Sequence, residues 1–420
     1  PTPRFIEMIR FSGEKMLSDL DALMKARNLD AIMVLGNAEH NPPMYYFTGG
    51  GHVSKAVLFK KPGETAVLYC NAMEREEAEK SGLTVIPLRY GALDELSKRP
   101  KEMFEARGLT SGRVGVYGQT DVSMALHIFG RIKEALPEVE LVGEDQESTI
   151  FMYAMESKDE REAARIRHMG KVTTEVVGMV ADYITSCDLR EDEVLLKEDS
   201  TPLTIGDVKG KISLWLTERG AVDVEGCIFA IGRDAGLPHS TGNPNDLMRL
   251  GETIVFDIFP GEAGGGYFYD FTRTWSLGYA KPEAQKLYDE VKSVYEKVIE
   301  NIDMNVDFRE YQRLVCDEFH RNGHKTPTHN EGVLTEGYVH SLGHGLGLNV
   351  HERPWSRHTA SDDNRLKPGA VFTIEPGLYY PEKGMGVRIE DSYWMRPDGT
   401  VERLAEYPYD FVLPMKKWKR

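Results

Sequence analysis

The sequence predicts an α+β protein in which a smaller α/β domain (residues 1–155) precedes a larger domain (residues 156–420) of helices packed on a mainly antiparallel sheet. Strand-like and helical patterns alternate in the first part, which is typical of α/β layers. A polar stretch at residues 156–162 then opens a long amphipathic pattern, and we place the domain boundary just before it. Farther along, Gly-rich turns join β-prone runs, as in antiparallel hairpins.

The first domain is expected to begin with a helix whose apolar face consists of Met16, Leu17, Leu20, Leu23 and Met24. β-prone runs predict strands at residues 31–35, 56–59, 66–68, 84–88 and 113–117. Helical patterns cover residues 93–106 and 121–136, and Pro100 predicts a break in the first of them.

Three helices are well marked in the second domain. The first follows the polar stretch and carries Ile166, Met169, Val176, Val180 and Tyr183. The second has a proline in its first turn and carries Pro282, Leu287, Val291, Val294 and Val298. The third ends near a glycine and carries Phe308, Tyr311, Val315, Phe319 and Gly323.

Charge and cysteine content disfavour several classes of function. The chain of 420 residues has 51 Lys and Arg against 67 Asp and Glu, and its net charge of −16 disfavours nucleic acid and anionic membranes as partners. We find neither a signal-peptide core nor an apolar run near the ~20 residues of a membrane helix, so we expect a cytoplasmic protein. The cysteines form no Cys-x-x-Cys pair, which disfavours disulfides and a thiolate zinc site; they are Cys70, Cys187, Cys227 and Cys316.

Residues 253–275 predict a hairpin whose arms carry Asp257 and Asp270. Residues directly opposite each other on two arms have Cβ atoms roughly 5 Å apart, and we expect the two aspartates to face each other. Two carboxylates this close among apolar neighbours repel each other unless a proton or a cation lies between them. Alternation along the strand places Thr272 on the face of Asp270, where its hydroxyl group can orient a carboxylate oxygen.

Residues 371–391 repeat this pattern with Glu375 and Glu390 on the arms. We expect the two glutamates to lie opposite each other, with Arg388 on the face of Glu390 and Asp391 on the other face. One such acid alone is most simply a surface charge. Two hairpins that each pair acids among Val, Ile and Phe are not explained as solvated faces, so the four inward carboxylates predict bound cations.

A Gly-rich segment at residues 338–354 contains three histidines. A zinc helix with His340 and His344 one turn apart needs a glutamate directly after the first histidine, but a serine stands there and the glycines disfavour a helix. The segment instead predicts a strand or loop in which the backbone approaches a site, with His344 as a ligand and His351 as a supporting or catalytic imidazole. By itself, His239 is interpreted as a solvent-exposed loop residue.

The residues of metal-ligand type occur in the order Asp257, Asp270, His344, Glu375 and Glu390. This order resembles the pita-bread metallopeptidase family, which includes methionine aminopeptidase, aminopeptidase P and prolidase. The matching segments are Asp-Phe-Thr-Arg-Thr from residue 270, Gly-His-Gly-Leu-Gly from 343, Glu-Pro-Gly from 375 and Val-Arg-Ile-Glu-Asp from 387. More loosely, residues 1–155 are similar to the N-terminal domain shared by creatinase, prolidase and aminopeptidase P. Methionine aminopeptidases lack that domain, so the resemblance favours the prolidase and aminopeptidase P branch.

The resemblance implies two divalent metal ions per chain. By this resemblance, Asp257 would bind one ion, and His344 and Glu375 would complete the site of the other. Asp270 and Glu390 would bridge both ions. Four carboxylates and one imidazole suit Mn, Co, Fe or Zn. A water molecule between the ions would be acidified and would attack the scissile carbonyl.

The same resemblance assigns roles around the ions. Glu375 would be the general base and proton shuttle, and His351 and His239 would steady the tetrahedral intermediate and position the substrate. Arg388 would anchor the bridging glutamate or a substrate carboxylate, and His340 also belongs to the expected substrate-binding residues. The implied substrate is a small peptide cleaved at an Xaa-Pro bond, and the implied assembly is a homodimer.

Two features depart from the family pattern. The aspartates are 13 positions apart, whereas many members keep them 11 apart; strict spacing would put Phe259 in the place of the first aspartate, and we expect a longer turn instead. The arginine that prolidases place before Glu-Pro-Gly has no persuasive counterpart, although Arg357 and Arg365 are near. Dipeptidase and aminopeptidase activity therefore both stay open.

Two other functions are compatible with this fold class. A metal-dependent hydrolase or lyase acting on a non-peptide small molecule would use the same ligands, because a fold does not fix the chemistry. A creatinase-like reaction is disfavoured, since creatinase works without metal and lacks these acids. A relative that only binds peptides or proteins usually loses several ligands, whereas this chain retains all five.

Overall fold

A computed structural model of the chain describes residues 19–360 and 363–417. Of the first expected helix, residues 19–26 are helical and bury Leu20 and Met24, while Met16 and Leu17 lie outside the described residues. The chain divides into two compact units. The first comprises the described residues through Met155 together with Gly264–Gly266, and the second comprises Glu156–Ala263 and the described residues from Tyr267 onward.

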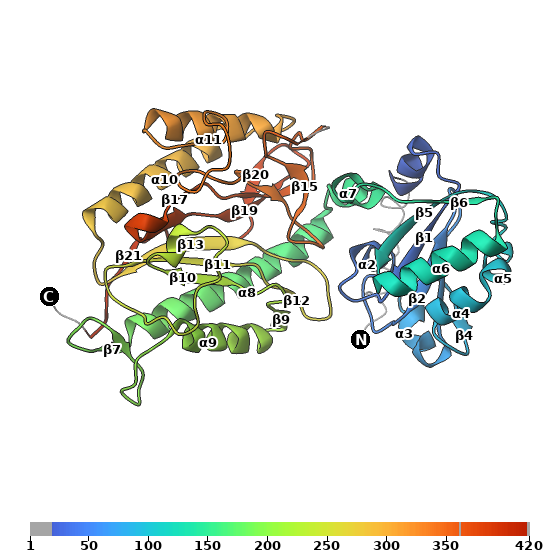
Figure 1. The fold of residues 1–420 in the computed structure, drawn as a ribbon, viewed down its shortest axis with the longest axis horizontal. Coiled ribbons are helices and arrows are strands. Elements are labelled where there is room, and N and C mark those ends of the chain that lie inside the picture. Colours follow the sequence, from blue (N-terminus) through green and yellow to red (C-terminus); the bar gives the residue numbers. More distant parts are fainter. Residues whose placement is uncertain (1–18, 361–362, 418–420) are drawn as a thin grey trace. The chain divides into compact units, whose positions relative to one another are not determined.

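The first unit is built on a six-stranded mixed sheet with the order β4-β3-β2-β1-β5-β6 (Figure 1). Its centre is β1, which runs parallel to β5 and antiparallel to β2 and is buried along its whole length. The strands are β1 (Ala31–Gly36), β2 (Ala56–Lys60), β3 (Val67–Asn71), β4 (Thr84–Leu88), β5 (Gly112–Gln119) and β6 (Val139–Val142). The helices are α2 (Pro42–Thr48), α3 (Arg75–Glu79), α4 (Ala92–Lys98), α5 (Pro100–Glu105), α6 (Val122–Ala135) and α7 (Ile150–Met155).

The strands predicted for this unit all form, and β6 is an additional strand. The helix expected over residues 93–106 is divided into α4 and α5 at Pro100, as the sequence predicts. Proline has no backbone N–H group, so it begins the second helix instead of continuing the first. The expected α/β layer structure of the first unit is therefore confirmed.

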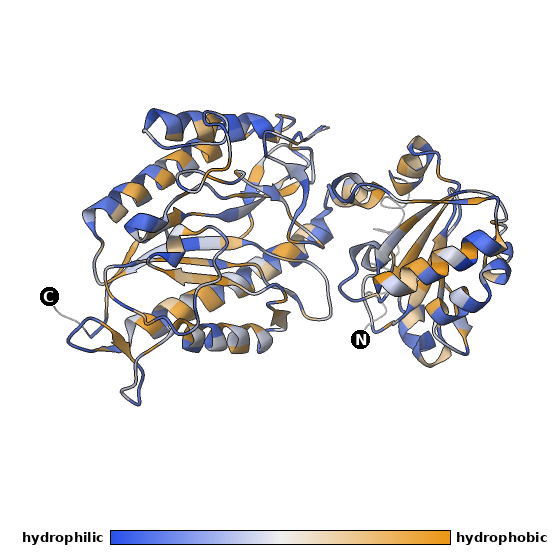
Figure 2. Cartoon of the chain, viewed as in Figure 1, coloured by the Kyte–Doolittle hydropathy of each residue, from blue (hydrophilic) through white to orange (hydrophobic). Residues whose placement is uncertain are grey.

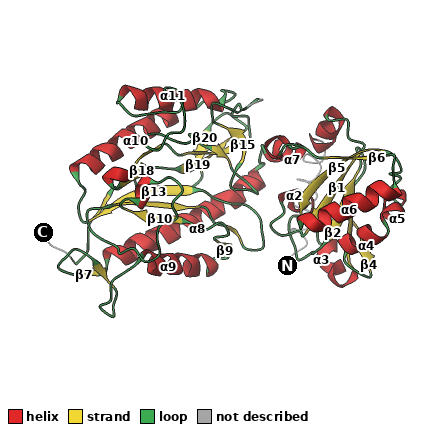
Figure 3. Ribbon diagram, in the orientation of Figure 1, coloured by secondary structure: helices red, strands yellow, loops and turns green. Residues whose placement is uncertain are grey.

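The second unit contains two larger sheets with the orders β10-β11-β13-β21 and β15-β14-β16-β19-β20, which pair mainly antiparallel, as expected. Figures 1 and 3 show α10 and α11 along one side of these strands and α8 and α9 along the other. The helices are α8 (Glu160–Thr185), α9 (Ile205–Thr217), α10 (Pro282–Asn301) and α11 (Phe308–Arg321). The strands are β7 (Asp188–Leu189), β8 (Leu195–Leu196), β9 (Ala221–Val222), β10 (Ile228–Ile231), β11 (Thr253–Ile258), β12 (Gly261–Glu262), β13 (Phe271–Leu277), β14 (His344–Gly345), β15 (Glu352–Trp355), β16 (Val371–Ile374), β17 (Gly377–Tyr380), β18 (Met385–Arg388), β19 (Asp391–Met395), β20 (Val401–Arg403) and β21 (Val412–Leu413).

Local sequence explains where the long helices begin. Asp159 and Glu162 form a reciprocal capping box at the start of α8, and Pro282 occupies the first turn of α10. In Figure 2 these helices carry both hydrophilic and hydrophobic residues, and the buried faces of α10 and α11 share one hydrophobic core with β16, β17, β18 and β19. Within the described part of the chain, no helix combines the length and the apolar composition of a membrane span.

Candidate metal centre

Asp257 and Asp270 lie on the hairpin of β11 and β13, where the register places Asp257 opposite Thr272. The expectation that the two aspartates directly face each other is therefore wrong. Thr272 and Asp270 are two residues apart and therefore share one face of the strand. The two aspartates are thus diagonal neighbours on that face. The connection between the arms contains the short strand β12, and the arms still pair, as expected for a longer turn.

Glu375 and Glu390 lie opposite each other on the second hairpin, as expected. Ile374 of β16 pairs with Asp391 of β19, and Gly377 of β17 pairs with Arg388 of β18 in the same register. Glu375 and Glu390 lie between these two sets of paired residues and therefore face each other. Asp391 lies on the other face, where its carboxylate pairs with Arg273.

The two hairpins are joined where β13 meets the second sheet. Thr272 and Glu390 form a backbone bridge in which Glu390 N donates to Thr272 O at 3.0 Å. On either side of this bridge, the hydroxyl groups of Ser392 and Thr274 donate to backbone carbonyl oxygens across the junction, both at 2.8 Å. Thr272 Oγ1 also donates to Glu390 Oε2 at 2.8 Å, which confirms that this hydroxyl group orients a carboxylate.

His344 reaches the carboxylates from β14, so the Gly-rich segment forms a strand and a loop instead of a helix, as expected. The glycines allow close approach of the neighbouring strands. A Cβ atom at Gly345 would lie 1.8 Å from Arg353 O, and one at Gly343 would lie 2.1 Å from Thr373 O. His344 Nδ1 donates to Gly345 O at 3.0 Å, so Nε2 is the nitrogen that faces the carboxylates.

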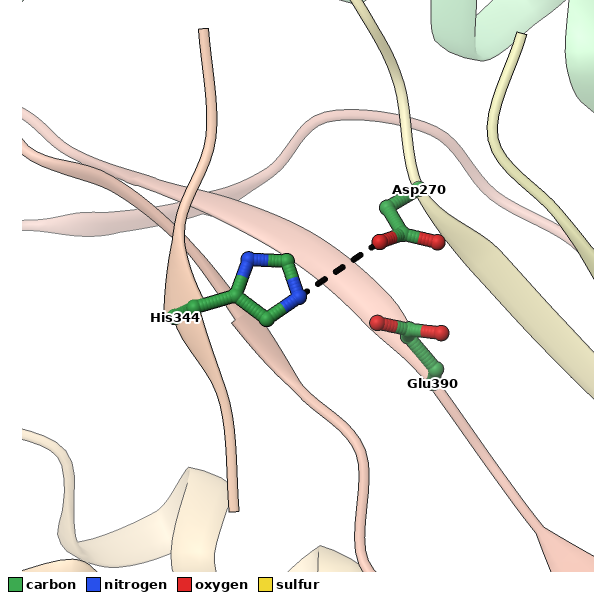
Figure 4. Close-up of side chains that lie close together, drawn as sticks. All are labelled: Asp270, His344 and Glu390. Atoms are coloured by element: carbon green, nitrogen blue, oxygen red, sulfur yellow. Dashed lines mark ion pairs between the residues drawn. The ribbon is translucent and has the colours of Figure 1, made fainter. Parts of the chain in front are cut away.

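The side chains of Asp270, His344 and Glu390 are buried and point toward one another from separate strands (Figure 4). Each offers a ligand atom, and these atoms lie within 4.8 Å of one another. His344 Nε2 is 3.5 Å from Asp270 Oδ2 and 3.3 Å from Glu375 Oε1. Carboxylate oxygens with one imidazole nitrogen are a donor set for hard to borderline divalent ions.

Three of these acids have a carboxylate oxygen without a hydrogen-bond donor. Asp257 Oδ1, Asp270 Oδ1 and Glu390 Oε1 are buried and accept no hydrogen bond from any described residue. A buried carboxylate oxygen is costly unless a donor or a cation compensates it. The residues present therefore fit divalent metal ions.

The charges of the cluster shift one another's pKa values. Burial, and after it the charge of Asp257, raises the pKa of Asp270 well above its ordinary value, and burial and Asp270 do the same to the pKa of Glu390. Burial lowers the pKa of His344, but Glu375 and Asp270 outweigh it and raise this pKa to about 9. Burial raises the pKa of Glu375, but the hydrogen bond and charge of His344 outweigh it and lower this pKa to about 2. Repulsion among like charges held this close is what a bound cation relieves.

Arg388 is buried and bonds to Asp257. Its role as an anchor of Glu390 or of a substrate carboxylate stays a prediction. Its Nη2 donates to Asp257 Oδ2 at 2.6 Å, and its Nη1 donates to the Tyr379 hydroxyl oxygen at 2.6 Å. The long side chain extends across β13 to β11, and it is also linked to Glu390 through Thr272, whose Oγ1 lies 3.3 Å from Arg388 Nε.

Tyr379 and His340 continue this hydrogen-bonded chain. The Tyr379 hydroxyl group accepts from Arg388 and donates to His340 Nε2 at 2.8 Å, and His340 Nδ1 donates to the next residue's carbonyl oxygen at 2.7 Å. Burial lowers the pKa of His340 to about 4, in keeping with a neutral ring. The sequence interpretation missed Tyr379, although its position four residues after Glu375 is the signal that could have placed it on the same face.

His351 and His239 are exposed residues beside the buried cluster. The ring centroid of His351 lies 4.3 Å from that of His344. His239 directly follows Pro238, whose carbonyl oxygen accepts a hydrogen bond from Arg388 Nη1 at 3.3 Å. Two histidines separated by more than 100 residues thus lie next to the same set of carboxylates.

The two arginines considered as carboxylate-binding residues differ in their surroundings. Arg365 is paired with Asp363 through hydrogen bonds of 2.7 and 2.9 Å. The Arg357 guanidinium lies over the ring of Trp355 at 5.1 Å, and Trp355 is paired with His344 in the ladder of β14 and β15. Of these two arginines, Arg357 is the one that lies beside β14, the strand of the candidate ligand His344.

A family model described as metallopeptidase family M24 matches residues 164–397, which include all five candidate ligands. The chain belongs to metallopeptidase family M24. A second model, the creatinase/prolidase N-terminal domain, matches residues 16–148 of this M24 protein. The expected family and the hydrolase class are confirmed, and the M24 family together with the buried ligand cluster implies divalent metal ions and a peptide substrate.

This M24 protein is 26% identical over 393 residues to a Xaa-Pro dipeptidase of Pyrococcus horikoshii, which covers 93% of this chain and 96% of that protein. Its fold is similar to that of a Xaa-Pro dipeptidase from Bacillus anthracis, with a TM-score of 0.75 at 21% identity over 95% of this chain and 99% of that one. An X-Pro aminopeptidase from Thermotoga maritima gives a TM-score of 0.70 at 22% identity over 94% and 98% of the two chains. The expected two-part architecture is therefore shared with solved structures.

Proposed function

We propose that this M24 protein hydrolyses the Xaa-Pro bond of small peptides, as an Xaa-Pro dipeptidase or an Xaa-Pro aminopeptidase. The observation that carries the proposal is the buried ligand cluster around His344, in which Asp257, Asp270 and Glu390 each keep a carboxylate oxygen without a donor. Similarity to the Pyrococcus horikoshii Xaa-Pro dipeptidase over 96% of that protein's length supports the substrate class.

The proposed centre holds two divalent ions, with Asp257, Asp270, His344, Glu375 and Glu390 as ligands. Asp270, His344 and Glu390 are the three whose ligand atoms lie within 4.8 Å of one another. The donor set suits Mn, Co, Fe or Zn. Ions bound here supply an acidified water molecule and a polarised scissile carbonyl, as amide hydrolysis requires.

Glu375 is the proposed general base. Its Oε1 lies 3.3 Å from His344 Nε2 and accepts from Thr373 Oγ1 at 3.4 Å, so one carboxylate oxygen is oriented by the chain. In the proposed reaction this carboxylate accepts a proton from the attacking water and returns it to the departing proline nitrogen.

The surrounding histidines bind and orient the peptide. His351 and His239 are exposed beside the cluster and are proposed to donate hydrogen bonds to the reacting carbonyl oxygen. Arg388 and His340 are the other proposed substrate-binding residues. They are joined through Tyr379, and Arg388 is bonded to Asp257.

A dipeptide presents its C-terminal carboxylate next to the scissile bond, and Arg357 is the cation proposed to bind it. On this basis the R357A variant should have a higher KM for Xaa-Pro dipeptides and an unchanged KM for Xaa-Pro-Yaa tripeptides. The R365A variant is the matched control, because it removes a nearby arginine whose neighbouring segment, at Asp307, carries no candidate ligand. Equal effects of both variants on both substrates would assign the carboxylate site elsewhere.

The central test removes the metals with chelator, restores Mn, Co, Fe or Zn separately, and assays Xaa-Pro dipeptides, Xaa-Pro-Yaa tripeptides and matched peptides without proline. We expect metal-dependent cleavage confined to the proline substrates, and the ratio of dipeptide to tripeptide activity names the subclass. Two bound ions per chain without cleavage of any peptide would refute the proposal and favour a non-peptide small molecule as substrate.

We also propose a homodimer that works in the reducing cytoplasm. The dimer is inferred from the family resemblance, and the compartment is supported by the free, buried state of Cys70, Cys187, Cys227 and Cys316. Light scattering of the purified protein at several concentrations measures the assembly, and a monomer mass throughout would contradict the dimer.

A further inference from the structure

Arg273 and Asp391 form a buried ion pair on the far side of the strands that carry Thr272 and Glu390. Both side chains are 0% exposed, and Arg273 Nη2 lies 2.9 Å from Asp391 Oδ1. Each residue directly follows a residue of the backbone bridge, so strand alternation turns it away from the candidate ligands. Any effect of the pair on the candidate ligands therefore passes through the backbone.

The Arg273 guanidinium bonds to both carbonyl groups of that bridge. Its Nη1 donates to Thr272 O and to Glu390 O, both at 2.9 Å. The other N–H groups donate to Pro408 O at 2.9 Å, to Asp391 Oδ1 at 2.9 Å and to Tyr407 O at 3.2 Å. All five donors of the guanidinium are thus used.

Aromatic side chains hold this ion pair in place. The guanidinium carbon of Arg273 lies 4.2 Å from the ring centroid of Phe271 and 4.3 Å from that of Tyr409. Asp391 Oδ2 accepts hydrogen bonds from the hydroxyl groups of Tyr295 and Tyr409, the latter at 2.6 Å. Arg273 is therefore held by two aromatic rings and by its counter-ion.

The candidate ligands are divided between the two sheets that this bridge joins. Asp257 and Asp270 belong to the hairpin of β11 and β13, whereas His344, Glu375 and Glu390 belong to the strands of the other sheet and its hairpin. The residues that would hold the proposed ions therefore come from both sides of the junction. The distance between the two groups of ligands therefore depends on the junction at Thr272 and Glu390.

We propose that Arg273, held by Asp391, is a positioning residue that fixes the spacing between these two groups of ligands and thereby sets the metal affinity. The proposal rests on the dinuclear centre of the proposed function. Lysine at this position keeps the charge but offers a point-like ammonium with three donors, so it cannot bond both bridge carbonyls, Asp391 and the two flanking carbonyls together.

The test compares wild type, R273K and the matched control R353K, because Arg353 is also a buried arginine of the second unit that makes no bond to the bridge. Titration calorimetry of the metal-free proteins with Mn²⁺ measures affinity, and amide hydrogen exchange measures the opening of residues 271–274 and 389–392. We expect R273K to lose roughly 10–100-fold in Mn²⁺ affinity and to exchange faster in these two segments. R353K should keep the affinity within about threefold and the wild-type exchange there.

A folded R273K with wild-type affinity and wild-type exchange at the junction would overturn the proposal, as would an equal loss of affinity in R353K. If R273K does not fold, D391N provides the second variant, since it keeps an oxygen acceptor for Arg273 but removes the charge; unchanged exchange at the junction in D391N would also overturn it. A wild-type protein that binds no metal would refute the proposed function, whereas the exchange data, which need no metal, still decide the role of Arg273.

Discussion

Replacing Lys158 with methionine is expected to destabilise the second unit by about 3–5 kcal/mol. Lys158 Nζ lies 2.7 Å from Glu352 Oε2, and the side chains of the pair are 1% and 0% exposed. Methionine retains most of the volume of the lysine stem, so the loss is mainly electrostatic, because the Glu352 carboxylate stays buried without its cation. Its other oxygen keeps only the neutral donors of Asn349, at 2.9 and 3.3 Å.

Urea unfolding of the metal-free protein, followed by tryptophan fluorescence, measures this loss. The signal reports the second unit because all five tryptophans follow residue 156. The double variant K158M/E352Q removes both charges, and we expect it to be more stable than K158M by at least about 2 kcal/mol. A loss below about 1 kcal/mol in K158M, or a double variant no more stable than K158M, would refute the reasoning.

Three further changes test local features. D307N keeps the helix cap but loses the ion pair with Arg309, at 2.8 Å. Arg309 lowers the pKa of Asp307 in the folded state. The ion pair therefore contributes about 0.5–1 kcal/mol above the unfolded pKa near 3.9, and this stabilisation disappears as pH falls through the lower folded pKa. Melting curves that differ equally at pH 7 and about pH 2 would contradict this. Y379F should reduce kcat/KM roughly tenfold and lower the free energy of unfolding by about 1–3 kcal/mol, because His340 Nε2 loses its buried donor. Steady-state assays that show wild-type rates would mean that the hydroxyl group of Tyr379 is dispensable for the reaction. G345A should lose at least about 2 kcal/mol, because its Cβ atom would lie 1.8 Å from Arg353 O, and an unchanged urea midpoint would contradict that account.

The second hairpin illustrates what the sequence determines by itself. The turn between β17 and β18 is short, the register continues from β16–β19 into β17–β18, and alternation alone places Asp391 on the opposite face. The expected pairing of the glutamates followed from this local geometry. The strand at His344 was likewise readable, because its flanking glycines disfavoured a helix.

The first hairpin shows where local reasoning ends. The connection between Asp257 and Asp270 contains the short strand β12. The register of the two arms therefore depends on contacts with residues outside the hairpin, which the local sequence does not predict. Arg388 has a long side chain, and which carboxylate it selects depends on the strand that lies across from it. The error in the first hairpin concerns the choice between Asp270 and Thr272, two residues apart, and only the assembled sheet makes that choice.

Buried charges were also hidden from the sequence. Residues 156–162 have the composition of a polar stretch, but Glu156 and Lys158 within it are buried. Their partners lie about 200 positions away, with Glu156 near Lys367 and Lys158 bonded to Glu352. Composition predicts exposure for such residues, and only the folded chain supplies the opposite charge that makes their burial acceptable.

The division of the candidate ligands between two sheets couples metal occupancy to the thermodynamics of folding. An ion held by Asp270 on one sheet and His344 on the other binds only when both sheets are in place. Binding to the folded state alone raises the free energy of unfolding by RT ln(1 + [M]/Kd), about 2.7 kcal/mol at a hundredfold excess over Kd. The thermal stability of this protein is therefore expected to follow the free metal concentration of its surroundings, so that starvation for metal weakens the fold at the same time as it stops the reaction.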